Sequence, residues 1–181
     1  DRTAGNGSQR YVLGGGTEIV TMARDGVLEP AALIDLKELP ELRVLEQNGG
    51  RLTVGACVTL SDLAEWTAFP LLSRAAAGVA DRTVRNSITL GGNIAGRLPY
   101  REAVLPFLLS DSVATVAGPH GQKQRRFHEL FSKRLKLQHV EFLVSLSVEQ
   151  GPAAAAYVYR RKTCGSRVDY PLMTLCAATV N

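Results

Sequence analysis

Apolar and polar positions alternate in short blocks along the chain, and the period of this alternation changes from one block to the next. Residues 69–80 carry apolar side chains at helical spacing, which predicts a helix. Residues 42–46 and 51–56 predict two strands, and the Asn-Gly pair within residues 47–50 favours the primed turn of a β-hairpin between them. Hairpins mixed with helices, without a regular series of βαβ units, predict an α+β fold.

The same pattern predicts further elements. Residues 10–13 are expected to form a strand that leads into a helix over 17–24, and residues 59–66 a capped helix whose Trp66 packs in the core. Residues 142–148 and 153–159 are expected to be two antiparallel strands joined through residues 150–152. We expect one domain boundary near residue 50 and another near residues 149–152.

Two glycine clusters, at residues 13–18 and 88–96, are the most informative local signals. Each combines glycines with a threonine and follows residues able to form an extended segment. Bare glycine backbone can bring N–H groups close to a ligand, and the threonine hydroxyl adds a donor, so the pair favours an anion site suited to phosphate. The alternative for either cluster alone is an ordinary tight turn.

A Rossmann dinucleotide fingerprint is the generic comparison for the first cluster. Asp35 lies about 20 residues downstream, where a ribose-binding acid is expected. The spacing places Gly14 and Gly16 in the motif but Ile19 at its third glycine, and that side chain would obstruct close packing of helix on strand. A nicotinamide-binding half-domain therefore remains only as an alternative.

Residues 14–18 and 84–94 resemble motifs of a known family, the FAD-binding (medium) subunits or domains of molybdenum hydroxylases. Residues 14–18 match an A-G-G-T-[DE] turn, and residues 84–94 match R-N-x-x-T-[IL]-G-G-N-[IL]. A segment like P-x-x-D-x-x-P and a G-x-x-G hairpin follow, so the resemblance covers residues 10–178. It implies two small α+β subdomains that clasp FAD (1–50 and 51–150) and the start of a largely absent C-terminal α+β domain (151–181).

The resemblance also implies roles for individual residues. The first cluster would hold the FAD pyrophosphate through Leu13, Gly14, Gly15, Gly16, Thr17 and the backbone of Glu18, and the second would clasp it through Thr89, Gly91, Gly92 and Asn93. Glu102 falls where relatives usually have Asp and would accept hydrogen bonds from sugar hydroxyls. Leu143 and Lys162 match positions that approach the isoalloxazine. Solvent-facing surface roles are the alternatives for Glu102 and Lys162.

The chain departs from the family at both ends. Relatives begin with a βα unit before the first glycine turn and close with a larger C-terminal domain, of which only the opening residues are present here. We therefore expect a fragment or a shortened relative, in which the flavin ring is less shielded than in a full-length relative.

Composition excludes several classes of function. The net charge is +4 among 181 residues, but the basic clusters are not joined by the aromatic side chains that nucleic-acid binding requires. Three cysteines and three histidines without ligand spacing predict no metal site. Apolar runs fall far short of the roughly 20 residues that span a membrane. No export signal is evident, so a cytoplasmic protein is expected.

The resemblance implies electron transfer without a general acid or nucleophile. FAD would receive electrons from [2Fe–2S] clusters on a small partner subunit, after substrate oxidation on a large subunit that holds the molybdenum cofactor. NAD⁺, oxygen or a quinone would then accept them. A cofactor-free assembly scaffold is the third alternative to this FAD subunit and the nicotinamide-binding half-domain.

Overall fold

A five-stranded antiparallel sheet forms the centre of this computed structural model, which describes residues 9–138, 140–166 and 169–179. The strand order is β3–β4–β9–β5–β6. The sheet comprises β3 (Leu45–Asn48), β4 (Arg51–Gly55), β5 (Val113–Gly118), β6 (Gly121–Arg126) and β9 (Phe142–Glu149). The central strand β9 is almost entirely buried because β4 and β5 pair with both its edges.

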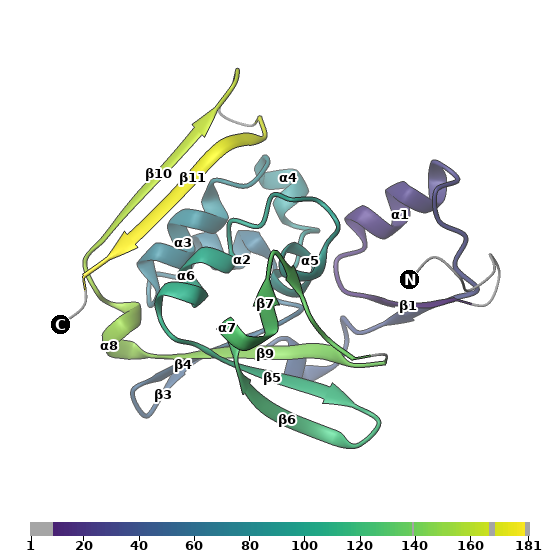
Figure 1. Cartoon of the computed structure of the whole chain (residues 1–181), viewed down its shortest axis with the longest axis horizontal. Coiled ribbons are helices and arrows are strands. Elements are labelled where there is room, and N and C mark those ends of the chain that lie inside the picture. The colour runs from purple at the N-terminus through teal and green to yellow at the C-terminus, as the bar shows by residue number, and fades with distance from the viewer. Residues whose placement is uncertain (1–8, 139, 167–168, 180–181) are drawn as a thin grey trace.

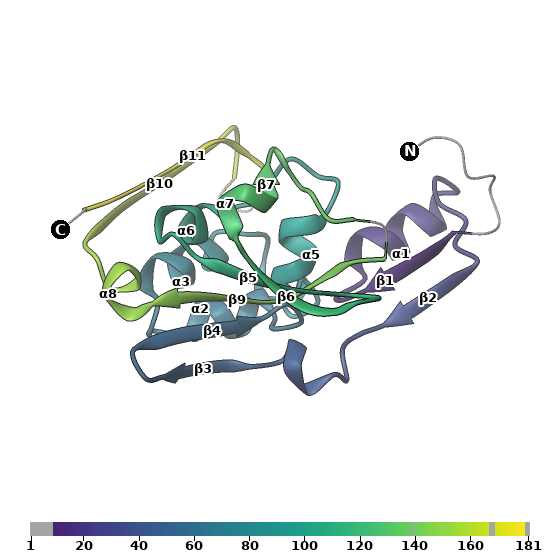
Figure 2. The same ribbon diagram turned by 60° about the horizontal axis from the view of Figure 1, so that its bottom comes forward.

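Short helices gather on one side of this sheet, as Figures 1 and 2 show. The helices are α2 (Leu60–Glu65), α3 (Pro70–Ala77), α4 (Arg82–Arg85), α5 (Leu90–Ala95), α6 (Val104–Leu109), α7 (Phe127–Leu130) and α8 (Gln150–Ala153). A core of fully buried side chains lies between the helices and the sheet, with Leu52 and Leu146 contributed by strands. Phe69 and Phe107 meet edge to face in that core, with ring centroids 5.7 Å apart.

A small unit precedes the sheet. It consists of β1 (Arg10–Leu13), α1 (Thr17–Arg24) and β2 (Ala32–Asp35), and β1 pairs in parallel with β2. No residue of α1 is buried, and all four residues of β2 are exposed. Figure 1 shows this unit beyond α5, at the opposite side of the molecule from the last two strands.

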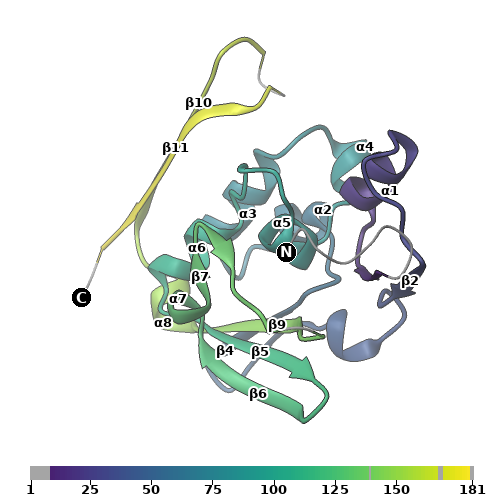
Figure 3. The same cartoon turned by 45° about the vertical axis from the view of Figure 1, so that its right-hand side comes forward.

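The last two strands, β10 (Tyr157–Thr163) and β11 (Pro171–Ala178), form an antiparallel ribbon beside α3 and α6. The expected pairing of residues 142–148 with 153–159 is wrong, because β10 pairs with β11 and not with β9. Both edges of β9 are occupied, and α8 redirects the chain at residues 150–153. The ribbon therefore stands apart from the strands of the central sheet (Figure 3) and makes its contacts with α3 and α6.

The remaining expectations are met with small shifts. Strand β1, helix α1 and the capping box of α2, formed by Thr59 and Asp62, occur as predicted, and Trp66 packs against the core. The β3–β4 hairpin turns on Gly49 and Gly50, both with positive φ, and a 3₁₀ turn at Pro40–Leu42 replaces the first part of the expected strand. Residue 50, near which we expect a domain boundary, lies in the turn of the β3–β4 hairpin. The division of the chain into subdomains stays a prediction.

Two short pieces complete the structure. Strands β7 (Phe131–Ser132) and β8 (Arg134–Leu135) pair in a small hairpin beside α5. The mixture of helices and strands is that of an α+β fold, as the sequence predicts. Across the described part of the chain, none of the helices reaches the length and apolar character needed to cross a lipid bilayer.

Candidate cofactor site

The first glycine turn joins strand β1 to helix α1. Strand β1 ends at Leu13, and Gly16 takes φ +79°, a left-handed conformation that an L side chain rarely adopts, so that α1 can begin at Thr17. The backbone N–H groups of Gly16, Thr17 and Glu18 donate to no acceptor in the described part of the chain. A helix start with free N–H groups attracts anions, because the donors and the helix dipole point the same way.

The second glycine motif is built differently. Thr89 is almost completely buried and caps α5 by accepting a hydrogen bond from the Gly92 N–H at 3.2 Å. The N–H of Leu90 donates to Val58 O, and that of Gly91 donates to Ala56 O at 2.8 Å. A Cβ at Gly91 would lie 2.9 Å from the Ala56 side chain. Close packing therefore explains Gly91, whereas Gly92 is exposed and leaves its Cα accessible.

The two turns are in direct contact. The Gly15 N–H points at Thr89 Oγ1, 3.3 Å away, and a Cβ on Gly15 would fall 1.7 Å from the carbonyl oxygen of Ser87. The Glu18 carboxylate accepts a hydrogen bond from the Arg97 N–H, with its two oxygens at 2.7 and 2.9 Å. The folded chain thus places side by side two motifs that the sequence separates.

The motif residues Arg85 and Asn93 support the surrounding backbone. Arg85 donates to the carbonyl oxygens of Val79 and Ala80, at 3.0 and 2.8 Å, just after α3. Asn93 Oδ1 accepts from the Ala103 N–H at 3.3 Å. This last contact links α5 to the segment that carries Glu102.

Glu102 is buried, with 3% of its surface exposed, beside the ribbon β10–β11. Its Oε1 lies 3.4 Å from Nε of Arg161, while its Oε2 has no hydrogen-bond partner among the described residues. A buried carboxylate oxygen without a donor is costly, so such an atom indicates a missing donor. The alternative of a solvent-facing Glu102 is wrong for this structure.

Arg161 is the polar group that sequence reasoning missed. In β10 the side chains at 157, 159, 161 and 163 face the helical layer, whereas Lys162 is exposed on the other face and lies opposite Met173 of β11. The sequence does contain a signal for this: Tyr157, Tyr159 and Arg161 alternate along the strand, which places Arg161 on the same face as the two tyrosines. Leu143 lies in β9 and is buried in the core at 5% exposure. Contact of Leu143 or Lys162 with a flavin stays a prediction.

Aromatic side chains lie beside this pair. Burial raises the pKa of the Tyr159 hydroxyl to about 12, and the charge of Glu102 contributes to the shift. The Tyr159 hydroxyl, like Oε2 of Glu102, has no partner within the residues described. Tyr100 and Tyr170 stack with ring centroids 4.4 Å apart and an interplanar angle of 15°, so they join the segment before Glu102 to the segment before β11.

Asp35, the candidate ribose-binding acid of the Rossmann comparison, makes a local contact. Its carboxylate accepts from the Lys37 N–H at 3.0 Å and pairs with the Lys37 ammonium. The backbone hydrogen bond and the ammonium both lower the pKa of Asp35. Its side chain is exposed at the end of β2.

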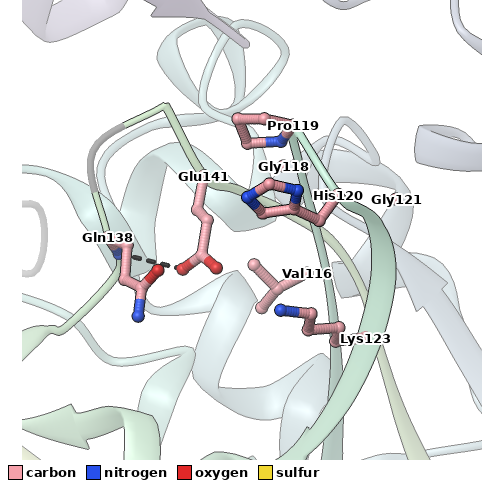
Figure 4. Close-up of a pocket in the computed structure, with 8 residues that line it drawn as sticks. All are labelled: Val116, Gly118, Pro119, His120, Gly121, Lys123, Gln138 and Glu141. Carbon is pink, nitrogen blue, oxygen red and sulfur yellow. Dashed lines mark hydrogen bonds between the residues drawn. The ribbon is translucent and has the colours of Figure 1, made fainter.

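A cavity of about 110 Å³ lies elsewhere, at the tip of the β5–β6 hairpin (Figure 4). His120, Lys123 and Glu141 line it, and the Gln138 N–H donates to Oε2 of Glu141 at 2.9 Å. None of the predicted cofactor residues lines this cavity. Among the described residues, His, Cys, Asp and Glu side chains form no group of three that could hold a metal ion.

The arrangement around the first turn suits a nucleotide diphosphate. Free N–H groups at the start of α1 can donate to phosphate oxygens, and the unpaired Oε2 of Glu102 can accept from a sugar hydroxyl. Both groups belong to segments that are held against α5, one by Gly15 and Glu18 and the other by Asn93.

Comparison with known proteins agrees with this chemistry. A family described as "FAD binding domain in molybdopterin dehydrogenase" matches residues 2–149. The carbon monoxide dehydrogenase medium chain of Hydrogenophaga pseudoflava is 30% identical over 166 residues, which are 87% of this chain and 58% of that protein. The nicotinate dehydrogenase FAD-subunit of Eubacterium barkeri is 22% identical and is matched over 82% of this chain and 53% of its own length.

Solved structures share the fold. A chain of quinoline 2-oxidoreductase from Pseudomonas putida 86 superposes with a TM-score of 0.83 at 25% identity, over 93% of this chain and 60% of that one. A chain of carbon monoxide dehydrogenase from Hydrogenophaga pseudoflava gives 0.80 at 28% identity, over 92% and 60%. The present chain thus spans little more than half the length of the relatives it matches.

Proposed function

This chain belongs to the family of FAD binding domains in molybdopterin dehydrogenases, and on that premise we propose that it holds FAD as the electron-transfer subunit of a molybdenum hydroxylase. The family assignment rests on a match over most of the chain. Nicotinate dehydrogenase, a relative, has a subunit named for FAD, which supports the same cofactor here.

The observation that carries the proposal is a set of unused donors in the first glycine turn and an unused acceptor in the segment after α5. The first turn offers the unused N–H groups of Gly16, Thr17 and Glu18, and the segment after α5 offers the unused Oε2 of Glu102. Diphosphate oxygens need donors and sugar hydroxyls need acceptors, and FAD carries both. The fit is therefore chemical, and it uses atoms that the protein itself leaves unsatisfied.

The residues of this chain would act by binding and orientation. The N–H groups at the start of α1 would hold the diphosphate, and the exposed Cα of Gly92 would allow it to approach α5. Glu102 would fix a hydroxyl-bearing part of the cofactor. When bound, FAD would supply the redox chemistry, accepting electrons one or two at a time. No side chain here needs to act as a nucleophile.

We propose that electrons reach the flavin from [2Fe–2S] clusters on a small partner subunit and originate at a molybdenum cofactor on a large one. Two relatives are named as the medium chains of carbon monoxide dehydrogenase and glyceraldehyde dehydrogenase, so each is one chain of an enzyme with several, which supports partner subunits here. NAD⁺ or another acceptor would receive the electrons.

Titration of the purified chain with FAD tests the proposal. We expect saturable quenching of flavin fluorescence with one site, and much weaker binding of NADH measured in parallel. Glu102→Ala should weaken FAD binding by about 1.5–3 kcal/mol, the range for a hydrogen bond to a charged group. Glu65→Gln, which alters only a surface ion pair with Arg82, is the control. Preference for NADH over FAD would favour the nicotinamide-binding alternative, and no binding of either would favour the scaffold.

A further inference from the structure

We propose that Arg161 is a positioning residue for Glu102, and that this pair makes docking of the ribbon β10–β11 and binding of the cofactor favour each other. The inference rests on the proposed function, because it assigns the free oxygen of Glu102 to a cofactor hydroxyl. It adds a role for the ribbon. Among the described residues, neither glycine motif forms a hydrogen bond with β10 or β11.

The geometry fixes Arg161 at both ends of its guanidinium. Nε lies 3.4 Å from Oε1 of Glu102, and Nη2 donates to the carbonyl oxygen of Asp169 at 2.6 Å. The Asp169 carboxylate in turn accepts from the Gly165 N–H, so Gly165 and Asp169 are both connected to the same guanidinium. The side chains of Arg161 and Glu102 are only 10% and 3% exposed.

The two oxygens of the Glu102 carboxylate have different surroundings. One oxygen faces the ribbon through Arg161, and the other has no donor within the described chain. Two further buried groups of the ribbon, the hydroxyls of Tyr159 and Thr174, also lack partners there. Thr174 lies opposite Arg161 in the ribbon. Burial, and then the charge of Glu102, raise the pKa of the Tyr159 hydroxyl. Polar atoms without partners thus concentrate where the ribbon meets Glu102.

A buried charge is tolerated only with a partner, and removing one member of such a pair is strongly destabilising. Arg161 therefore holds Oε1 of Glu102 in place and so fixes the direction in which Oε2 can accept a hydrogen bond. If the ribbon moves away, the carboxylate loses that orientation and binds the hydroxyl less well. By linkage, a bound cofactor must then stabilise the docked ribbon by the same factor.

The first test measures FAD affinity of the full chain and three variants. Arg161→Met keeps the length and apolar stem but removes the charge, and we expect binding about 10- to 100-fold weaker. Arg161→Lys restores a cation and should recover most of the affinity. Arg160→Met is the matched control, since Arg160 is exposed on the other face of β10, and it should bind like the natural chain.

The second test measures the reverse coupling by amide hydrogen exchange in the ribbon. FAD should slow exchange in β10 and β11 of the natural chain, and this protection should disappear in Arg161→Met and in Glu102→Gln. The double variant, Arg161→Met with Glu102→Gln, should lose no more affinity than the weaker-binding single variant, because both changes disrupt the same ion pair.

Equal FAD affinity in Arg161→Met and the natural chain would overturn the inference while leaving the proposed function intact. Losses in Arg161→Met that Arg161→Lys does not recover, with no protection of the ribbon by FAD, would reduce the pair to a structural contact and also overturn it. Failure of the natural chain to bind FAD would instead contradict the proposed function, and the inference would fall with it.

Discussion

The two glycine turns share a chemical signature but differ in what holds them. The second turn is part of the body: Thr89 is 3% exposed, and Leu90 and Ile94 are completely buried on α5. The first turn belongs to a unit whose helix α1 has no fully buried residue. Its position depends on a few contacts to the second turn, through Gly15 and Glu18.

The two turns therefore have different roles: the second supports the first, and the first has the donors that can bind a ligand. In the second turn the N–H groups of Leu90, Gly91 and Gly92 are already used by protein acceptors. In the first turn the N–H groups of Gly16, Thr17 and Glu18 find no acceptor among the described residues. A buried motif with satisfied donors thus contacts a less buried motif with free donors, and only the less buried motif can donate hydrogen bonds to an anion.

Gly15→Ala should disrupt the contact between the two turns most completely. The added Cβ would meet the Ser87 carbonyl oxygen at 1.7 Å, and a backbone atom cannot yield that much, so the two turns must separate. We expect no measurable FAD binding, with the thermal unfolding of the body little changed. Gly151→Ala, whose Cβ would meet nothing within 4 Å, is the control. Normal FAD affinity in Gly15→Ala would show that contact between the turns is not needed.

Gly92→Val should remove binding without loosening the body. Its Cβ would meet only Thr89 Oγ1, at 3.0 Å, but the side chain would cover the exposed surface where a diphosphate approaches. We expect FAD affinity to fall by at least about 100-fold, a steric effect worth about 3 kcal/mol. Gly91→Val should instead lower the melting temperature, because its Cβ would strike Ala56. Stoichiometric flavin retained by Gly92→Val would exclude the second turn from the site.

Glu18→Ala should weaken the contact between the first turn and the segment after α5 without abolishing it. It removes the acceptor for the Arg97 N–H, and the partly exposed contact should be worth about 1–1.5 kcal/mol. FAD affinity should therefore fall by about 10-fold. Glu18→Gln keeps an acceptor and should retain most of the binding measured by fluorescence titration. Identical affinity in all three proteins would leave Gly15 as the link that matters.

Thr89→Val has the smallest expected effect. The Oγ1 atom caps α5 and faces the Gly15 N–H, but both distances exceed 3.1 Å. Loss of such a cap costs about 1 kcal/mol of stability, and we expect a fall of a few degrees in melting temperature. Thr89→Ser keeps the hydroxyl and should melt like the natural chain. A fall as large as that of Gly91→Val would mean that Thr89 supports the whole body.

Several features were predictable because they depend on local chemistry. The capping box of Thr59 and Asp62, the glycine turn of the β3–β4 hairpin and the helix after Gly16 follow from spacing and backbone preference. The partner of β10 was not predictable, because pairing depends on which strand edges are already occupied. Glu102 could be proposed from its place in a motif, whereas its partner Arg161 comes from a segment far along the chain.

The family, the two glycine–threonine turns and the α+β class can be derived from the amino-acid sequence, since short motifs and hydrophobic period carry that information. Three features depend on the folded chain: which turn has free N–H groups, which face of β10 points inward, and which oxygen of Glu102 has a partner among the described residues. The physical reason is that a hydrogen bond is satisfied by whatever group packing brings near, and packing joins residues that the sequence keeps apart.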